Sequence, residues 1–160
     1  MMPTRTPVFS KTTFILLLFC HTFTPARAQP DTVKFGVFIN DIYDLNLSEQ
    51  SFSTEFWVWY NYRNPELKPL ETLELPNAKS VESSLDFSEQ KEGISWAGKK
   101  VHAVIKKDWD VRRFPFDEQI MTIELEESDQ DIGTMVYVAD RENTKLNPKL
   151  TLSNWKIERF

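Results

Sequence analysis

A proline-containing segment set between two stretches of alternating apolar and polar residues constrains the fold of this chain more than any other feature of its sequence. Alternation with a period of two predicts β-strands that bury one face. Pro115 has no backbone N–H to give to a sheet, and it favours an extended conformation of Phe114. Residues 107–121 are therefore predicted to form a structured connection, which we call the proline loop. The apolar positions of the two strands are Val101, Ala103 and Ile105 before the loop, and Met121, Ile123 and Leu125 after it.

The proline loop carries two aromatic rings that need a place to pack. Phe114 and Phe116 flank Pro115, and Arg112, Arg113 and Asp117 lie beside them. Two interpretations stay open from these residues alone. The rings pack beneath their own loop, as side chains of compact surface loops often do, or they dock against another domain.

The rest of the chain after residue 30 has the character of short strands separated by turn residues, with no convincing helical period. The predicted strands include residues 33–39, 52–62, 81–87 and 135–138, and residues 150–157 close the chain. Residues 88–93 are predicted to form a charged turn, and Ala97-Gly98 the turn of a hairpin between residues 94–96 and a strand that begins at Lys99. About nine such strands predict an all-β fold, an immunoglobulin-like antiparallel β-sandwich.

Aromatic residues occupy both faces of the strand predicted at residues 52–62. The strand alternates Phe56, Val58 and Tyr60 with Trp57 and Trp59. Neither of its faces is therefore predicted to be purely polar and exposed to solvent. Ordinary packing inside a sandwich is the simpler interpretation of the two tryptophans, because aromatic residues favour strands. A subunit interface, where aromatic residues are enriched, is the alternative.

The first 28 residues have the organisation of a secretory signal peptide. Arg5 and Lys11 precede a short apolar run at residues 14–19, and Ala26-Arg27-Ala28 forms a cleavage site, so we expect cleavage before Gln29 and a domain at residues 29–160. Removing Arg5, Lys11 and Arg27 takes the formal charge from -5 to -8 and leaves no cysteine. An acidic domain of this kind is a poor candidate for nucleic-acid binding.

Catalytic and metal-binding chemistry finds little support. His102 is the sole histidine after residue 28, which excludes a zinc site built on histidines and cysteines and argues against a Ser-His-Asp or Cys-His arrangement. Asp129, Asp131 and Gly133 are spaced unlike a calcium loop, because the glycine falls at the fifth position and not the sixth. This acidic segment is either a solvated turn or a weak cation site. We therefore expect no enzyme, no cofactor and no dedicated metal site.

The order Asp110-Val111-x-x-Phe114-Pro115-Phe116-Asp117-x-Gln119 resembles the signature loop of pentameric ligand-gated ion channels, the Cys-loop receptor superfamily. In animal members two cysteines close that loop. Lys107 and Met121 stand at those positions here, so the disulfide is absent, as in prokaryotic members. The resemblance extends from about Val33 to Phe160, and it implies an extracellular ligand-binding β-sandwich that stops before the final strand and before four membrane helices.

The resemblance also implies roles for particular residues. Two acidic residues of the family approach a basic residue just before the first membrane helix, and Asp44 and Asp117 match them. Tyr62 would lie on the complementary face of the ligand pocket, and Asp129 and Asp131 belong to a loop that lines the pocket in the family but has no aromatic residue here. The implied coupling residues are Asp44, Arg113, Phe114, Pro115, Phe116 and Asp117, and the implied ligand-binding residues are Tyr62, Asp129 and Asp131.

Two functions follow as expectations. The first is the extracellular ligand-sensing domain of a bacterial channel, with five identical copies around a central vestibule, a small-molecule ligand bound at subunit interfaces, and a place at the outer side of the cell membrane. The second is a free periplasmic binding module of the same fold without a pore.

Overall fold

The computed structural model describes residues 29–160, and in that part of the chain the only regular secondary structure is β. The predicted all-β class is therefore confirmed, whereas the predicted signal peptide lies outside the described residues. Eight strands are present where about nine were expected, and three of them have only two residues. In order along the chain they are β1 (Asp31–Asn46), β2 (Ser51–Tyr62), β3 (Leu73–Glu74), β4 (Ala78–Lys91), β5 (Ile94–Lys106), β6 (Glu126–Glu127), β7 (Met135–Ala139) and β8 (Lys145–Leu146).

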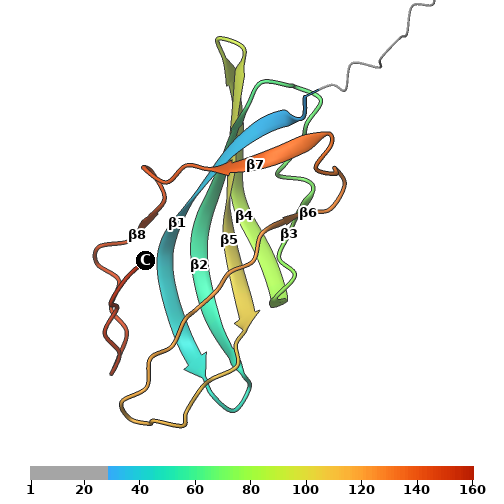
Figure 1. Cartoon of the computed structure of the whole chain (residues 1–160). Coiled ribbons are helices and arrows are strands. Elements are labelled where there is room, and N and C mark those ends of the chain that lie inside the picture. The colour runs from blue at the N-terminus through green and yellow to red at the C-terminus, as the bar shows by residue number, and fades with distance from the viewer. Residues whose placement is uncertain (1–28) are drawn as a thin grey trace, which may run out of the picture.

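One large sheet dominates the molecule, with the strand order β4-β5-β2-β1-β7 and with β8 also paired to β1 (Figure 1). Strands β1, β2, β5 and β4 pair antiparallel, as the prediction required. β7 and β8 instead pair parallel to β1, which differs from the prediction. The long connection from β5 to β7 explains the difference, because it crosses the sheet to the free edge of β1 and a parallel pair needs a crossover of this kind.

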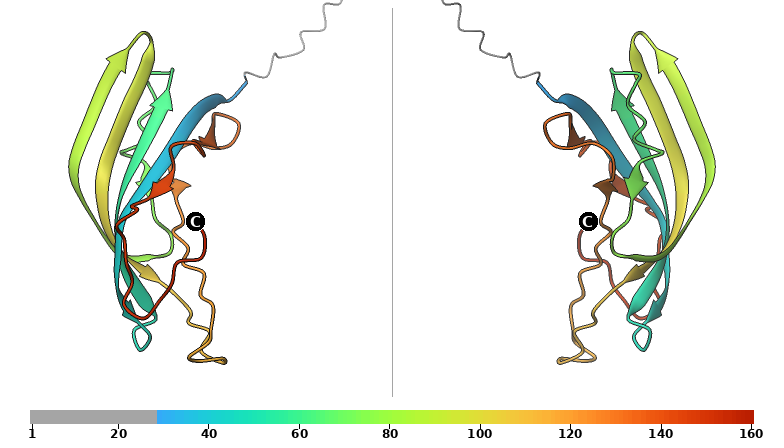
Figure 2. Two further views of the ribbon diagram at one scale, coloured as in Figure 1. Left: turned by 90° about the vertical axis from the view of Figure 1, so that its left-hand side faces the viewer. Right: turned by 90° about the vertical axis from the view of Figure 1, so that its right-hand side faces the viewer.

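A second, less regular layer covers one face of this sheet (Figure 2). It includes the two-stranded sheet β3-β6 and the extended segment between the proline loop and β6. Met121, Ile123 and Leu125 in that segment are half-buried against the core, and Thr122 and Glu124 between them are exposed. The alternation therefore predicted the facing of these side chains correctly, although a strand ladder forms only at β6.

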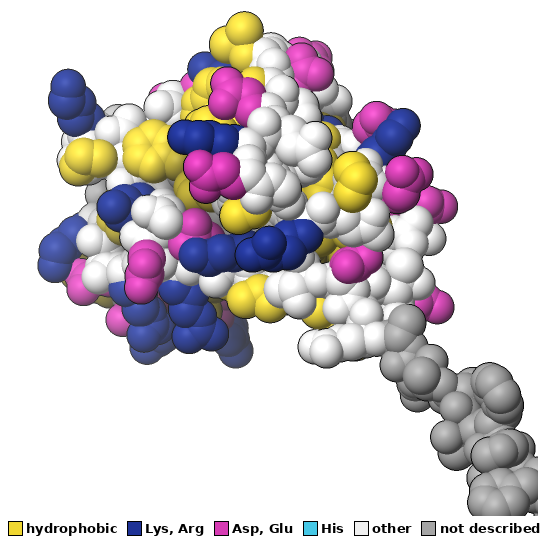
Figure 3. Space-filling model, turned by 90° about the horizontal axis from the view of Figure 1, so that it is seen from above, with side chains coloured by type: hydrophobic (Ala, Val, Ile, Leu, Met, Phe, Trp, Pro, Cys, Tyr) yellow, Lys and Arg dark blue, Asp and Glu magenta, His cyan; other side chains and the backbone are white. Residues whose placement is uncertain are grey.

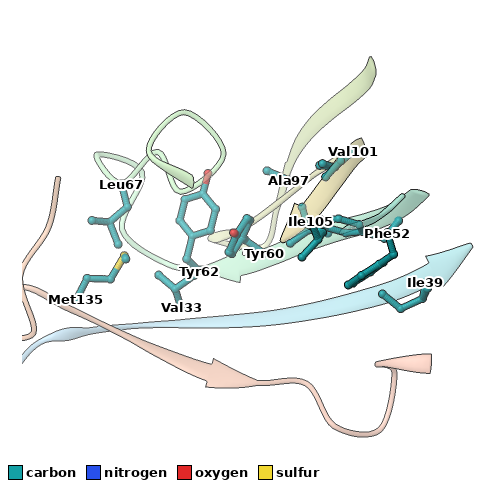
Figure 4. Packing of buried hydrophobic residues seen from close by; sticks show 13 residues of the cluster. Val33, Ile39, Phe52, Tyr60, Tyr62, Leu67, Ala97, Val101, Ile105 and Met135 are labelled. Carbon is teal, nitrogen blue, oxygen red and sulfur yellow. The ribbon is translucent and has the colours of Figure 1, made fainter. Parts of the chain in front are cut away.

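The hydrophobic core lies between the large sheet and the second layer, and β2 supplies its centre (Figure 4). Phe52, Phe56, Val58 and Tyr60 are buried almost completely. Burying an aromatic or branched aliphatic side chain of this kind stabilises a fold by roughly 1.5–3 kcal/mol. The ring of Tyr137 on β7 lies 5.7 Å from that of Tyr60, which ties the late strand to the core.

The turn predicted at Ala97-Gly98 is wrong. β5 runs through both residues without interruption, and the hairpin turns instead at Glu92 and Gly93, which have φ values of 53° and 74°. Gly98 is required for a different reason: a Cβ placed on it would lie 2.7 Å from the ring of Phe87. Glycine here makes room for an aromatic ring and does not mark a turn.

Candidate functional site

The proline loop leaves β5 and lies at the same end of the molecule as the turn between β1 and β2 (Figure 1). Two hydrogen bonds connect the loop to that turn. The backbone N–H of Lys107 donates to the carbonyl of Gln50 at 2.9 Å, and the indole N–H of Trp109 donates to the carbonyl of Asn46 at 3.0 Å. The base of the proline loop is thus attached to the sheet through the turn between β1 and β2.

Side-chain hydrogen bonds define the conformation of the proline loop itself. Gln119 donates from Nε2 to the backbone carbonyl of Asp110 at 2.8 Å and to Oδ2 of Asp117 at 2.6 Å. Arg112 pairs with Asp110 at 2.5 Å, and its hydrogen bonds hold the pKa of the Asp110 carboxyl well below its usual range. The Phe114–Pro115 peptide is cis. The loop therefore has a defined shape although most of it is in contact with solvent.

The two rings at the tip of the proline loop are exposed. Phe114 is 71% exposed and Phe116 is 88% exposed, and Ile120 and Val111 add further exposed apolar surface. Packing beneath the loop itself, one of the two interpretations left open by the sequence, is therefore wrong for both rings. Arg113 is also exposed, while Asp117 is half-buried at its hydrogen bond with Gln119.

Asp44, the other acidic residue of the predicted coupling set, lies near the end of β1. It is exposed and has a φ of 49°, a conformation that aspartate tolerates better than most residues. The register between β1 and β2 shifts at this point, between Tyr43 and Asn46. The end of β1, which carries Asp44, lies at the same end of the molecule as the proline loop, which carries Asp117 (Figure 1).

The tryptophans of β2 face away from the core. Phe56, Val58 and Tyr60 point into the core, so Trp57 and Trp59 lie on the opposite side of the large sheet, which we call the outer face. Packing inside the sandwich was the simpler prediction for them, and it is wrong. They instead line a hollow of about 240 Å³, the aromatic groove, whose walls are Phe38, Trp57, Val58, Trp59, Phe87 and Trp96.

Glycines on both sides of Trp59 account for the aromatic groove. Gly36 on β1 and Gly98 on β5 are the direct register partners of Trp59, and Phe87 is the partner of Gly98. A Cβ on Gly36 would lie 2.3 Å from the Trp59 ring. The absence of side chains at the two glycines lets the rings of Trp59 and Phe87 lie against the sheet, which leaves a hollow between the remaining rings.

A group of charged residues borders the aromatic groove on the outer face. The carboxylate of Glu55 accepts hydrogen bonds from Lys100 at 2.6 Å and from Asn40 at 2.5 Å, and it lies 3.4 Å from Nε2 of His102. Partial burial raises the pKa of Glu55, but Lys100 and His102 outweigh this effect and leave the pKa below its usual value. Sequence reasoning assigned no role to this group; the in-register alternation of β2 and β5 is the signal that would have found it.

The three predicted ligand-binding residues are not brought together in one pocket. Tyr62 is only 8% exposed and belongs to the core, where burial raises the pKa of its hydroxyl (Figure 4). Asp131 is exposed and accepts hydrogen bonds from the backbone N–H groups of Gly133 and Thr134, so it shapes its own turn. Asp129 is exposed and lines a separate small pocket. Their ligand roles stay predictions.

The small pocket beside Asp129 has a volume of about 160 Å³ and is bordered by the segment before β3 and the loop after β6. Glu127 organises its polar side: one carboxylate oxygen accepts hydrogen bonds from Thr72 at 2.8 Å and from Tyr137 at 3.0 Å. The other accepts from the backbone N–H groups of Asp129 and Gln130. A carboxylate with four donors is well satisfied, so Glu127 has a structural role that sequence reasoning missed.

Residues 29–160 contain neither a metal-site arrangement nor a membrane-spanning helix. No group of histidine, cysteine, aspartate and glutamate side chains in that range has the arrangement of a metal site. The same residues contain no helix of the length and apolar character needed to cross a bilayer.

The all-β architecture is consistent with the ligand-binding domain of a pentameric channel. No family model matches the chain. A proton-gated ion channel of Gloeobacter violaceus is 22% identical over 156 residues, a match that covers 85% of this chain and 44% of that channel. The chain thus spans less than half the length of this relative. The similarity supports the resemblance to the channel superfamily, and it fits the prediction that the chain is not an enzyme.

Proposed function

We propose that this chain is the extracellular ligand-sensing domain of a bacterial pentameric ligand-gated ion channel. Five identical copies surround a vestibule, and a signal peptide at residues 1–28, cleaved before Gln29, directs the domain to the outer side of the cell membrane. The residues predicted for coupling, Asp44 and residues 113–117, contact the membrane domain and transmit ligand binding to the pore. The exposure of Phe114 and Phe116 on a loop of defined shape is the observation that carries this proposal.

The exposed rings favour a docking role on energetic grounds. Each aromatic ring left in water forgoes roughly 1.5–3 kcal/mol that burial would supply. Hydrogen bonds from Gln119 and Trp109 hold the loop in this position instead of letting it fold back. A loop that is preorganised with its apolar side chains outward loses less conformational entropy when it binds a partner. A free periplasmic module would have no use for this arrangement.

For the ligand we propose the aromatic groove as one wall of a site at the interface between copies. Interfaces are enriched in aromatic residues, and Trp96 in the groove is 45% exposed. A neighbouring copy laid against the outer face would close this open hollow. A ligand held between two copies shifts the channel between closed and open states by its different affinity for the two.

A chimera tests the proposal. Residues 29–160 replace the matching part of the Gloeobacter violaceus channel, and currents are recorded together with the amount of protein at the cell surface. We expect a conducting chimera, and we expect Phe114→Ala with Phe116→Ala to abolish gated currents without lowering the surface amount. Leu85→Ala, at an exposed apolar position outside the proline loop, is the control. Unchanged gating in the double variant would contradict the coupling role and favour a free binding module.

A further inference from the structure

Four charged or titratable side chains form a continuous row across the outer face. His102 on β5 is the direct register partner of Glu55 on β2 and of Glu82 on β4, so a carboxylate faces it from each neighbouring strand. Glu55 in turn is the register partner of Asp41 on β1. Directly opposed residues of antiparallel strands share one face of a sheet. We call Asp41, Glu55, His102 and Glu82 the histidine row.

Other charges near His102 come from its own strand. Lys100 lies two residues earlier on the same face, and its ammonium is bound to Glu55. Lys106 lies four residues later, at the end of β5. Asn40, which is neutral, donates to Glu55 from β1. His102 is 38% exposed at its side chain, so protons reach it directly from solvent.

The histidine row lies two residues along the strands from the aromatic groove. Lys100 is the register partner of Trp57, and Trp57 lines the groove. Residues two apart on a strand are separated by about 7 Å, so a charge on His102 acts on the groove from roughly 7–10 Å. No intervening strand separates them.

The unpaired charged side chains around the aromatic groove carry a net negative charge. Lys100 is paired with Glu55, and Lys34 is paired with Asp140 at 3.0 Å. Asp41 and Glu82 remain on the side of the histidine row, and Glu89, the register partner of Trp96, remains on the other side. Lys145, the register partner of Phe38, adds one positive charge, so the three carboxylates still outnumber it. Aromatic rings that line a hollow bordered by negative charge suit a ligand with an apolar body and a positive charge.

We propose that the histidine row sets the charge preference of the aromatic groove and that protonation of His102 weakens this preference. The inference rests on the proposed function, because it takes the groove to be a ligand site. Histidine is the side chain whose charge changes between pH 5 and 8. A positive charge added at His102 offsets one carboxylate of the row, and by Coulomb's law at this distance it lowers the affinity for a cation on the order of fivefold.

The first experiment needs no ligand. Indole N–H signals of the full chain are followed by NMR from pH 8 to pH 5.5, with assignment by tryptophan substitution. We expect the signal of Trp57 to move together with the titration of His102, and the signal of Trp155, which packs against Trp109, to stay still. In His102→Gln the movement of Trp57 disappears. A Trp57 signal that ignores the His102 titration overturns the proposal.

The second experiment uses choline and its neutral isostere 3,3-dimethyl-1-butanol as probes, with tryptophan fluorescence as the readout. We expect choline to bind about fivefold more weakly at pH 5.5 than at pH 8 and the neutral probe to show no such change. His102→Gln removes the pH dependence and keeps binding, and Glu82→Gln weakens choline at both pH values. Binding of choline that does not depend on pH overturns the proposal on charge preference. If neither probe binds at any pH, the groove is not a ligand site. The first experiment then decides only whether protonation of His102 affects Trp57.

Discussion

The aromatic groove and the tip of the proline loop are both apolar surfaces exposed to solvent, and they are held in place in different ways. The aromatic groove belongs to the large sheet, where backbone pairing and two glycines position its rings. The tip of the proline loop is positioned by a few side-chain hydrogen bonds outside any sheet. The groove is therefore part of what makes the domain stable, whereas the loop tip can change without affecting the fold. Sheet and loop should respond differently to equivalent substitutions.

The largest difference is expected between two phenylalanines. Phe56 is fully buried in β2, and Phe116 is 88% exposed. Phe56→Ala should lower the free energy of unfolding by about 4 kcal/mol, because it removes a core ring and leaves a cavity. Phe116→Ala should change it by less than about 0.5 kcal/mol. Urea denaturation followed by tryptophan fluorescence measures both, and comparable losses would show that the loop tip is part of the core.

A smaller effect is expected at the floor of the aromatic groove. A Cβ on Gly98 would lie 2.9 Å from the backbone carbonyl oxygen of Val58 as well as against the Phe87 ring. Since a backbone atom cannot rotate away, Gly98→Ala should cost about 3 kcal/mol of stability. Gly133→Ala is the matched control, because its nearest neighbour is the side chain of Asp131 at 3.1 Å. Equal midpoints of thermal unfolding for the two variants would argue against a close-packed groove.

The two surfaces also differ in how a carboxylate contributes to stability at different pH. Asp140 is buried in the sheet region, and hydrogen bonds from Asn143 together with the ion pair to Lys34 lower its pKa. A lowered pKa in the folded state gives stability that is present above the unfolded pKa and is lost as the pH falls through the folded value. Asp140→Ala should therefore cost about 2 kcal/mol at pH 7 and progressively less on acidification.

Asp110 in the proline loop provides the comparison for Asp140. Its pKa is also lowered, by Arg112, but the ion pair is exposed to solvent. Exposed pairs contribute little to stability, so Asp110→Ala should leave the unfolding midpoint unchanged between pH 4 and pH 7. A pH-dependent loss as large as that of Asp140→Ala would contradict the distinction.

The smallest effect concerns the shape of the proline loop. Gln119→Ala removes the two hydrogen bonds that it donates to Asp110 and Asp117. Local opening of the loop should become easier by about 1 kcal/mol, which corresponds to roughly fivefold faster amide exchange in residues 110–120. Global stability should change little. Glu118→Ala, an exposed neighbour, is the control, and equal exchange in the two variants would show that Gln119 does not hold the loop.

The sequence predicted the sheet better than the sites. Alternation located β2 and the ends of β7 within a residue or so, because both strands bury one face. The turn signal at Gly98 was misleading, because this glycine makes room for an aromatic ring on another strand. After Met121 the alternation predicted a strand, but alternating burial occurs there mostly without a ladder. Pairing and ring contacts depend on residues far apart in the chain, and local patterns do not contain that information.

The candidate sites also differ in whether a local motif or long-range strand pairing defines them. The exposed rings of the proline loop follow from a local motif, and its resemblance to a family indicated them. The aromatic groove and the histidine row depend on which residues of four strands stand opposite one another. Before the register was known, Trp57 was therefore assigned to sandwich packing, with a subunit interface as the alternative, and His102 received no role. At the end of the molecule opposite the proline loop, charged side chains are interspersed with hydrophobic areas (Figure 3).

The pairing of β1 has a consequence for how the chain acquires its structure during synthesis. β1 can pair with β2 soon after both strands are synthesised. Its other edge stays unpaired until β7 is available, since Asp31 pairs with Met135. Contacts between such distant residues slow folding, because a long stretch must be ordered before they form. Until β7 has left the ribosome, the nascent protein presents an open strand edge, and at this stage it is most exposed to association with other chains.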